Sequence, residues 1–185
     1  MRFLIVVFIF IISNFFVVCA NEIESKENSG WQFSIGLGIH TLSFDNYIHE
    51  SSNGIATSLQ AGYLFENGVS VYYENNVNFY NSDYYDETFV SGITGLGLSY
   101  PLTNKLYISG LYGLAIDRSL FMEDSDEFSA TGSGYGVTLG YRISDKFSIE
   151  TNYMSFNLDE AETSRDDFSI DADGNAFRAI ARYTF

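Results

Sequence analysis

The sequence predicts an all-β protein, an eight-stranded antiparallel up-and-down transmembrane β-barrel. Three observations support this fold. Eight segments of roughly ten to thirteen residues alternate apolar with small or polar side chains, a period of two that is typical of strands. The connections between them alternate between long polar stretches and short turns, as they do when one end of a barrel faces each side of a membrane. The alternation continues to the aromatic residue Phe185.

The N-terminal region is expected to be removed before folding. Residues 1–20 have the basic start, apolar run and small residue at Ala20 of a cleaved signal peptide. A retained membrane helix over these residues, or lipoprotein processing at Cys19, are the alternatives. Residues 21–30 are polar and form a flexible lead-in, and residues 31–185 form one domain. Because Cys19 is the single cysteine, closure of the barrel has to stabilise the processed chain in place of disulfides.

The first three strands are expected at residues 31–40, 54–64 and 69–79. The first has the cleanest alternation, with five apolar residues from Trp31 to Ile39 separated by Gln, Ser and Gly. The second and third are joined by a short turn with Asn67-Gly68, a strong hairpin signal. Asn75 interrupts the apolar parity of the third strand, so a bulge or a simple exception is expected there.

The next four strands are expected at residues 88–100, 106–116, 131–143 and 147–156. Each has Leu, Ile, Val or aromatic residues on one parity, and small or polar residues on the other. The fixed φ of Pro101 suits the short turn before the fifth strand. The long polar connections are expected at residues 43–53, 80–87, 117–130 and 157–175.

The last strand, residues 176–185, reads AFRAIARYTF. Phe177, Tyr183 and Phe185 lie on its apolar parity, while Arg178 and Arg182 lie on the other. A final Phe with Tyr two residues before it resembles the C-terminal insertion signal of bacterial outer-membrane β-barrels. The whole processed chain is similar to the small barrels of the OmpA transmembrane-domain and OmpX/Ail-like type.

This resemblance implies an exported monomer of the Gram-negative outer membrane. Residues 21–30 would lie in the periplasm and residues 31–185 in the membrane, inserted by the barrel-assembly machinery and surrounded by lipid and lipopolysaccharide. The short turns would face the periplasm and the long loops the cell surface. The alternative is a soluble, lipocalin-like barrel with its apolar parity inside. The Gly, Ser and Ala residues on the polar parity argue against it, because they suit a narrow interior.

Charged residues on the inward parity are the first candidate site. They are Glu74, Glu150, Arg142, Arg178 and Arg182. Unpaired charges in a narrow lumen are unfavourable, so we expect a network of ion pairs and hydrogen bonds, with Arg182 and Glu150 as the preferred pair. The network would act as a structural plug or, in the second interpretation, as the gate of a pore.

The long connections are the second candidate site. Besides Asp117, they hold 16 of the 24 acidic residues of a chain whose formal net charge is −15. Such acidity argues against a nucleic-acid partner and favours either a solvated surface or a protein contact. Six aromatic residues would either anchor such a contact or continue the strands and the girdle above the membrane: Tyr80, Tyr84, Tyr85, Phe121, Phe128 and Phe168. Residues 171–175 imitate the start of a calcium loop, but Arg182 replaces the bidentate glutamate, so no metal site or other cofactor is expected.

Enzymatic activity has little support in the sequence. The two histidines are His40, on a strand, and His49, which lies beside Glu50 and Ser51 in a loop. Adjacent loop residues rarely have the geometry of a catalytic triad. We therefore predict a non-enzymatic outer-membrane barrel with a structural or surface-interaction role, in adhesion or envelope integrity. A narrow, porin-like channel for small solutes or ions and a lipid A-modifying enzyme are the alternatives.

Overall fold

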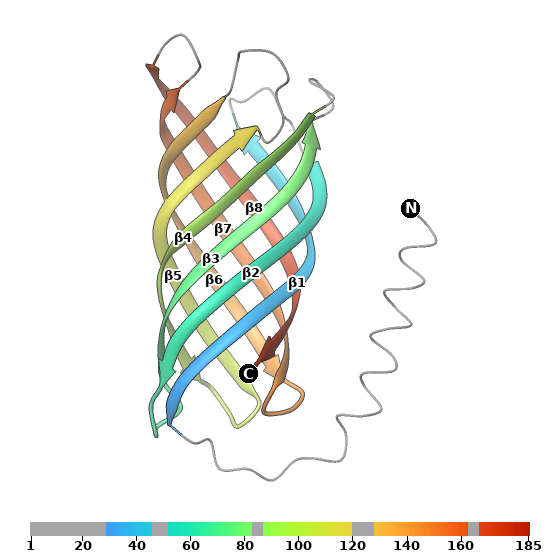
Figure 1. Ribbon diagram of the computed structural model, residues 1–185, viewed down its shortest axis with the longest axis vertical. Helices are drawn as coiled ribbons and strands as arrows, with labels where there is room; N and C mark the ends of the chain where they lie inside the picture. The colour runs from blue at the N-terminus through green and yellow to red at the C-terminus, as the bar shows by residue number, and fades with distance from the viewer. Residues whose placement is uncertain (1–28, 46–51, 83–86, 120–127, 163–166) are drawn as a thin grey trace, which may run out of the picture.

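The computed structural model describes residues 29–45, 52–82, 87–119, 128–162 and 167–185. They form one closed antiparallel barrel in which each strand pairs with its neighbours in sequence and β8 pairs with β1 (Figure 1). The strands are β1 (Gly30–Asp45), β2 (Ser52–Leu64), β3 (Ser70–Ser82), β4 (Glu87–Pro101), β5 (Leu106–Ser119), β6 (Ser129–Arg142), β7 (Phe147–Glu162) and β8 (Asp167–Thr184). The predicted fold is therefore confirmed. The described residues include no helix long and apolar enough to span a membrane.

The three short turns lie at one end of the barrel, together with Phe185 (Figure 1). In the β2–β3 turn, Gly68 adopts a φ of 79°, and Asn67 Oδ1 accepts a hydrogen bond from the Val69 backbone at 3.1 Å. Glycine adopts this left-handed conformation without the steric cost that a Cβ would add. The Asn67-Gly68 pair thus forms the turn for which the sequence selects it.

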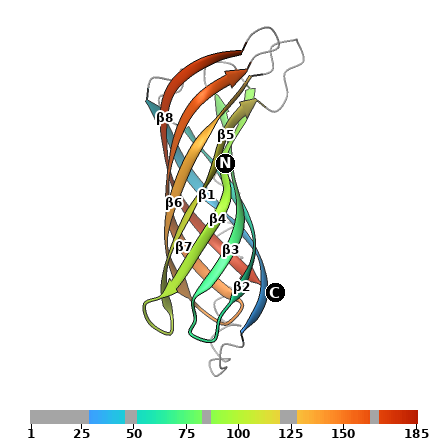
Figure 2. The same cartoon turned by 90° about the vertical axis from the view of Figure 1, so that its left-hand side faces the viewer.

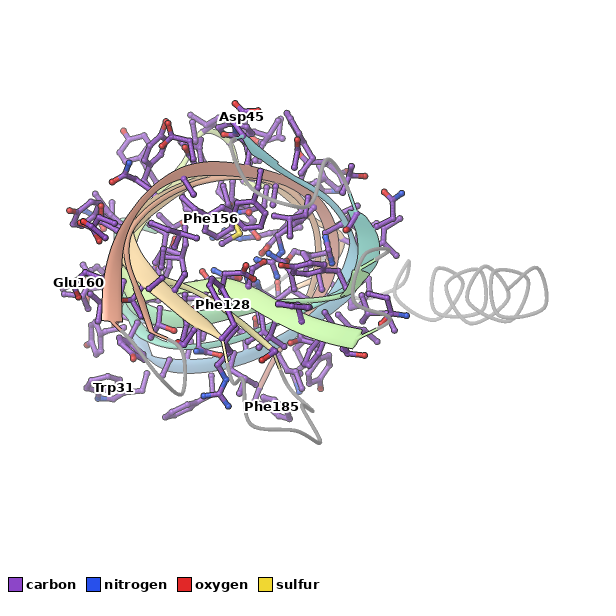
Figure 3. All side chains as sticks on the ribbon, turned by 90° about the horizontal axis from the view of Figure 1, so that it is seen from above. Trp31, Asp45, Phe128, Phe156, Glu160 and Phe185 are labelled. Atoms are coloured by element: carbon purple, nitrogen blue, oxygen red, sulfur yellow. The ribbon has the colours of Figure 1, made fainter. Side chains whose placement is uncertain are left out.

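The apolar parity faces outward over the strand segments that the sequence predicted. Trp31, Leu96, Leu114 and Phe177 are 72%, 67%, 74% and 66% exposed, and Figure 3 shows Trp31 outside the ring of strands. We call these outward apolar residues, from Trp31 to Ile39 on β1 and at matching positions on the other strands, the apolar belt. A continuous exposed belt of this kind is stable only in contact with lipid.

Five strands extend beyond the sequence prediction at the loop end by three or more residues. β1 continues to Asp45, β3 to Ser82, β5 to Ser119 and β7 to Glu162, and β8 begins at Asp167. The expected connections 43–53, 80–87, 117–130 and 157–175 are therefore wrong in extent, and part of each is strand.

The reason is that the alternation reverses beyond the apolar belt. Leu42, Phe44, Phe156 and Leu158 point inward and are at most 4% exposed, while the polar residues between them point outward. Figure 3 shows Phe156 inside the ring. Above the belt the barrel thus has an apolar interior and a polar exterior, like a soluble barrel. A strand pattern that requires outward apolar residues does not fit this region, so the sequence analysis assigned it to loops.

The β7–β8 hairpin is the longest part of this extension and rises at the end opposite the short turns (Figures 1 and 2). The register shifts at Asp159 against both neighbouring strands. Relative to β6, Asp159 is an extra, bulged residue, and relative to β8 it lies opposite two residues between Ser169 and Ala172. Asp159 and Glu160 are both exposed. The bulge therefore allows two consecutive acidic side chains to face solvent.

Candidate functional site

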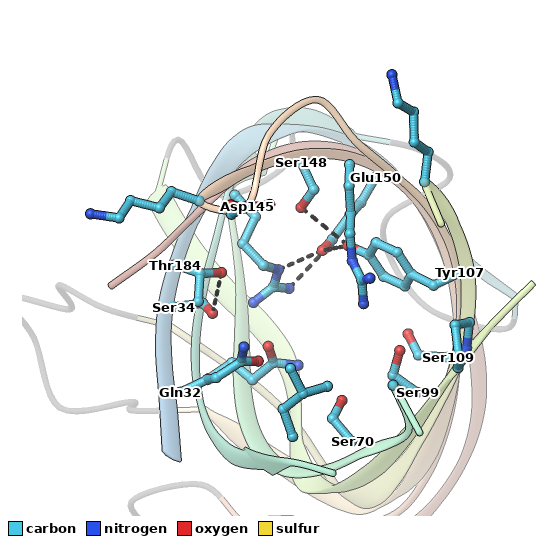
Figure 4. Close-up of a pocket in the computed structure, with 18 of the residues that line it drawn as sticks. Gln32, Ser34, Ser70, Ser99, Tyr107, Ser109, Asp145, Ser148, Glu150 and Thr184 are labelled. Atoms are coloured by element: carbon cyan, nitrogen blue, oxygen red, sulfur yellow. Dashed lines mark hydrogen bonds and ion pairs between the residues drawn. The ribbon is translucent and has the colours of Figure 1, made fainter. Parts of the chain in front are cut away.

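The lumen contains a buried ion triad of Arg182, Glu150 and Glu74, which come from β8, β7 and β3 (Figure 4 shows Glu150). Arg182 Nε donates to Glu150 Oε1 at 2.6 Å, and Nη2 donates to Glu74 Oε1 at 2.6 Å and to Glu150 Oε2 at 3.0 Å. All three residues are at most 6% exposed. Short charge-assisted hydrogen bonds of this kind compensate for the loss of water around the charges. The structure thus brings together the expected pair, Arg182 and Glu150, and adds Glu74.

Two inward tyrosines surround the triad. The Tyr107 hydroxyl donates to Glu150 Oε1 at 2.5 Å and lies 3.1 Å from Ser148 Oγ, and Tyr72 OH donates to the Gly110 carbonyl at 3.3 Å. Each ring lies over a glycine that is its direct partner on the next strand, Gly140 for Tyr107 and Gly97 for Tyr72. A Cβ on Gly140 would lie 2.0 Å from Tyr107 Cζ.

Arg178 lies one layer further from the short turns and has a different environment. Its Nη1 donates to Asn76 Oδ1 and, at 3.3 Å, to Met154 Sδ, while its Nη2 donates to the Thr57 carbonyl at 2.8 Å. It is 3% exposed. His40, its direct partner on β1, lies with Nε2 3.1 Å from the Phe79 carbonyl oxygen. Neutral groups therefore hold Arg178, whereas the two glutamates bind Arg182.

An apolar layer fills the lumen beyond Arg178. The buried cluster consists of Leu42, Phe44, Tyr80, Phe89, Ile93, Leu111, Met154, Phe156, Leu158 and several alanines, with Phe128 packed against it and Tyr72 at its end toward the triad. Phe44 contacts Phe156 at a ring distance of 6.1 Å and lies over Gly174, its direct partner on β8. This layer separates the triad from the end that carries the long connections.

Asp117 is buried among these apolar side chains, next to the buried Ser91, its direct partner on β4. It is fully buried, and its Oδ1 accepts a hydrogen bond from Tyr80 OH at 2.7 Å. Its Oδ2 has no hydrogen-bond partner among the described residues. The Tyr80 ring stacks on Phe89, its direct partner on β4, at 5.7 Å. Tyr80 is thus a lumen residue, which rules it out as an anchor for an external partner.

A polar cavity of about 980 Å³ occupies the turn end of the lumen (Figure 4). Hydroxyl and amide side chains line it, including Gln32, Ser34, Ser70, Ser99 and Ser109. The triad residues lie at its inner end, and among the described residues of the buried apolar cluster Tyr72 alone lines it. The cavity is therefore a vestibule that stops at the triad.

The remaining predicted lumen charge, Arg142, lies in this vestibule. Its guanidinium carbon is 5.4 Å from the centre of the Tyr107 ring, within range of a cation–π contact. It is half-buried. Arg142 thus contacts the network through the face of the Tyr107 ring.

The residues of the proposed insertion signal lie on the outer surface. Tyr183 and Phe185 contact each other edge to face at 5.1 Å near the turn end, and the Phe185 backbone donates to the Phe33 carbonyl at 2.9 Å. Phe177 packs against Tyr153 at 5.0 Å near the other edge of the apolar belt. These aromatic residues occupy the positions expected of two interfacial girdles.

The other candidate residues divide between strands and undescribed segments. Tyr84, Tyr85, Phe121 and His49 lie outside the described residues, as does the Phe168 side chain. Residues 171–175 form part of β8, with Asp173 outward and Gly174 inward, so they do not form a calcium loop. In the described part of the chain, no group of three or more His, Cys, Asp or Glu residues is placed to hold a metal.

Sequence reasoning missed several lumen residues, above all Tyr72, Tyr107 and Asn76. A signal for the tyrosines exists, because each is an inward aromatic residue opposite a glycine in the paired strand. That signal requires the register, which a single strand does not reveal. Asn76 has no such signal, because its partner Arg178 is not on an adjacent strand.

Comparison with known proteins agrees with this architecture. The family model described as outer membrane protein beta-barrel domain matches residues 10–185. The solved structure of Ail, the attachment invasion locus protein of Yersinia pestis, in complex with the heparin analogue sucrose octasulfate, is 19% identical. The match has a TM-score of 0.61 and covers 84% of this chain and 99% of that one.

Neisserial surface protein A is 14% identical, with a TM-score of 0.54 and coverage of 86% and 100%. No curated protein gives a significant sequence match. The structural matches show the shared fold, and the family model covers most of the sequence. The chain therefore belongs to the outer membrane protein beta-barrel domain family, whose members reside in the outer membrane of Gram-negative bacteria.

Proposed function

We propose that this protein is a closed outer-membrane barrel that acts at the cell surface, through the strand extensions and loops above the apolar belt. The observation that carries this proposal is the filling of the lumen. The buried ion triad, the Arg178 layer and the apolar layer lie one above the other and leave the vestibule open to the periplasm alone. A filled lumen supports a role in adhesion or envelope integrity, and the lumen charges then serve stability.

The partner that best fits the surface end is basic. Among the described residues of this end, Asp45, Asp159, Glu160 and Asp173 are exposed acids, and Arg118 is an exposed base. The segments between these strands add more acidic residues in sequence. Ail was solved with a polyanion, sucrose octasulfate. An acidic rim repels such a ligand and attracts a cationic surface instead, so we infer a different partner class for this protein.

Binding to charged probes tests this proposal. Vesicles containing the protein are passed over immobilised oligo-lysine and over heparin, with the loops on the outside. We expect retention on oligo-lysine that falls with added salt, and none on heparin. Neutralising the four rim acids (Asp45→Asn, Asp159→Asn, Glu160→Gln, Asp173→Asn) lowers the affinity roughly tenfold, because the long-range attraction is lost.

The matched control neutralises two acids at the turn end, Glu66→Gln and Asp145→Asn, and leaves retention unchanged. A second variant shortens the four long loops and tests whether they share the contact in a cell-adhesion assay. Retention on heparin, or equal retention of the native protein and the rim variant on oligo-lysine, contradicts the proposal.

The channel and enzyme alternatives have separate tests. A sealed lumen predicts no steady single-channel current in planar bilayers, and a large steady current from the intact protein would refute the plug. His40 is buried and its Nε2 contacts a backbone carbonyl, which does not suit a catalytic base. His49 is the other histidine of the chain. For a non-enzymatic protein we expect an unchanged lipid A mass spectrum after His49→Ala.

Export and insertion complete the proposal. We infer that residues 1–20 are removed as a signal peptide and that residues 21–29 remain in the periplasm as a lead-in to β1, which begins at Gly30. The exposed Phe177, Tyr183 and Phe185 then supply the signal for the barrel-assembly machinery. N-terminal sequencing of the outer-membrane fraction should begin at Asn21.

A further inference from the structure

The apolar belt is interrupted at Asn75 of β3. The outward residues of this strand are Val71, Tyr73, Asn75, Val77 and Phe79, so Asn75 has two apolar neighbours on each side and lies at the centre of the belt. Its pairing with β2 and β4 continues without a register shift, so no bulge turns it inward. In the described strands it is the only amide or charged side chain within the belt.

Asn75 is only partly satisfied by its own barrel. Its Nδ2 donates to Thr94 Oγ1, on the directly paired residue of β4, at 2.6 Å. An asparagine side chain has two N–H donors and an oxygen that accepts two hydrogen bonds. Its Oδ1 and second N–H have no other hydrogen-bond partner among the described residues. The hydrocarbon core offers no water to take the place of a missing hydrogen-bond partner. The unpaired groups of the Asn75 amide are therefore unfavourable in an isolated barrel.

Asn75 lies in a row of two short polar side chains between two longer apolar ones. Leu59, Asn75, Thr94 and Leu114 lie in one paired row across β2 to β5. The outer two are 58% and 74% exposed, while Asn75 and Thr94 are shorter and half-buried between them. Small polar residues flanked by larger apolar ones allow close approach of another protein surface within a membrane.

In place of the monomer that the family resemblance implies, we propose that a second copy of this chain docks on the β3–β4 face and that Asn75 hydrogen-bonds across the contact. All copies in the outer membrane have the same orientation, with loops toward the cell surface. A symmetric pair therefore has its two-fold axis along the membrane normal, and each residue meets residues at its own depth. At the centre of the belt, that residue is the second Asn75. Two amides form a self-complementary pair, each donating one N–H and accepting one.

Energy transfer in vesicles tests this dimer. Donor- and acceptor-labelled copies carry the dye at Asn104→Cys in the β4–β5 turn, in a Cys19→Ser background. We expect transfer above the level of random proximity as the protein-to-lipid ratio rises. Asn75→Leu should weaken the dimer by roughly 3- to 30-fold, the range measured for hydrogen bonds between membrane segments. This variant removes a polar group from lipid and should still fold, which the retained β-sheet circular dichroism verifies.

The matched control is Thr151→Val on β7, another exposed polar residue of the belt on a different face. It should leave energy transfer unchanged. Disulfide cross-linking adds a readout of position, because Asn75→Cys brings two sulfurs together at the axis and Thr151→Cys does not. Random-proximity transfer for the native protein, an unchanged dimer in Asn75→Leu, or equal cross-linking of the two cysteine variants each overturns the proposal.

Discussion

Replacing Arg182 with methionine keeps most of the side-chain volume but removes the only cation that contacts Glu74 and Glu150 in the described lumen. Three charge-assisted hydrogen bonds disappear, and two carboxylates that are 6% and 4% exposed lose their compensation. Removing one partner of a buried ion pair costs about 3–5 kcal/mol. Since two acids are stranded here, we expect the upper part of that range, about 4–5 kcal/mol.

Equilibrium unfolding in guanidinium chloride, with the protein in detergent micelles, measures this loss. The single tryptophan, Trp31, lies on the outer surface and reports release from the apolar environment. The triple variant Glu74→Gln, Glu150→Gln, Arg182→Met should recover more than half of the lost stability, because no uncompensated charge remains. Arg142→Met, at the edge of the network, should cost about 1 kcal/mol or less. A loss below about 1 kcal/mol for Arg182→Met, or no recovery in the triple variant, would refute the interpretation of the triad as a charge-balanced plug.

Two further predictions concern packing and burial, and the same unfolding assay checks both. Gly140→Ala should lower stability by about 1–3 kcal/mol, because the added Cβ displaces the Tyr107 ring, whereas Gly110→Ala, where a Cβ meets nothing within 4 Å, should be neutral. Equal effects at the two positions would show that the ring does not depend on the glycine. Asp117→Asn should raise stability by about 1–3 kcal/mol at pH 9, because the amide still accepts from Tyr80 and no buried charge remains. A destabilised Asp117→Asn variant would mean that the carboxylate has a favourable partner.

The fold could be predicted from the sequence because lipid enforces a simple rule. Within the apolar belt, every outward position has to tolerate hydrocarbon, so the period of two is visible from Trp31 to Ile39 and in seven other segments. The strand ends could not be predicted by that rule. Beyond the belt, Leu42 and Phe44 follow the opposite parity, and only the change of surroundings from lipid to water explains the change of face.

The lumen was predictable in part. The inward parity identified the charges, and the similar distance of Arg182 and Glu150 from the turn end, on adjacent strands, predicted their contact. Glu74 belongs to a strand that is not adjacent to β8, so its contact with Arg182 depends on the curvature of the closed sheet. The same holds for Arg178 and Asn76. Contacts across the lumen arise from barrel radius and strand tilt, which no single strand encodes.

The position of both deeply buried arginines on β8 has a consequence for assembly. Until β8 pairs with β1 and β7, Glu74 and Glu150 lack their counter-ion. Removing water from the interior of such an incomplete barrel would leave two buried carboxylates without compensation. Such an intermediate has to keep its interior wet. Pairing of β8 with β1 and β7 then closes the barrel, neutralises the two glutamates and expels the water in one step. The same strand thus completes the sheet and supplies the positive charge that the interior needs.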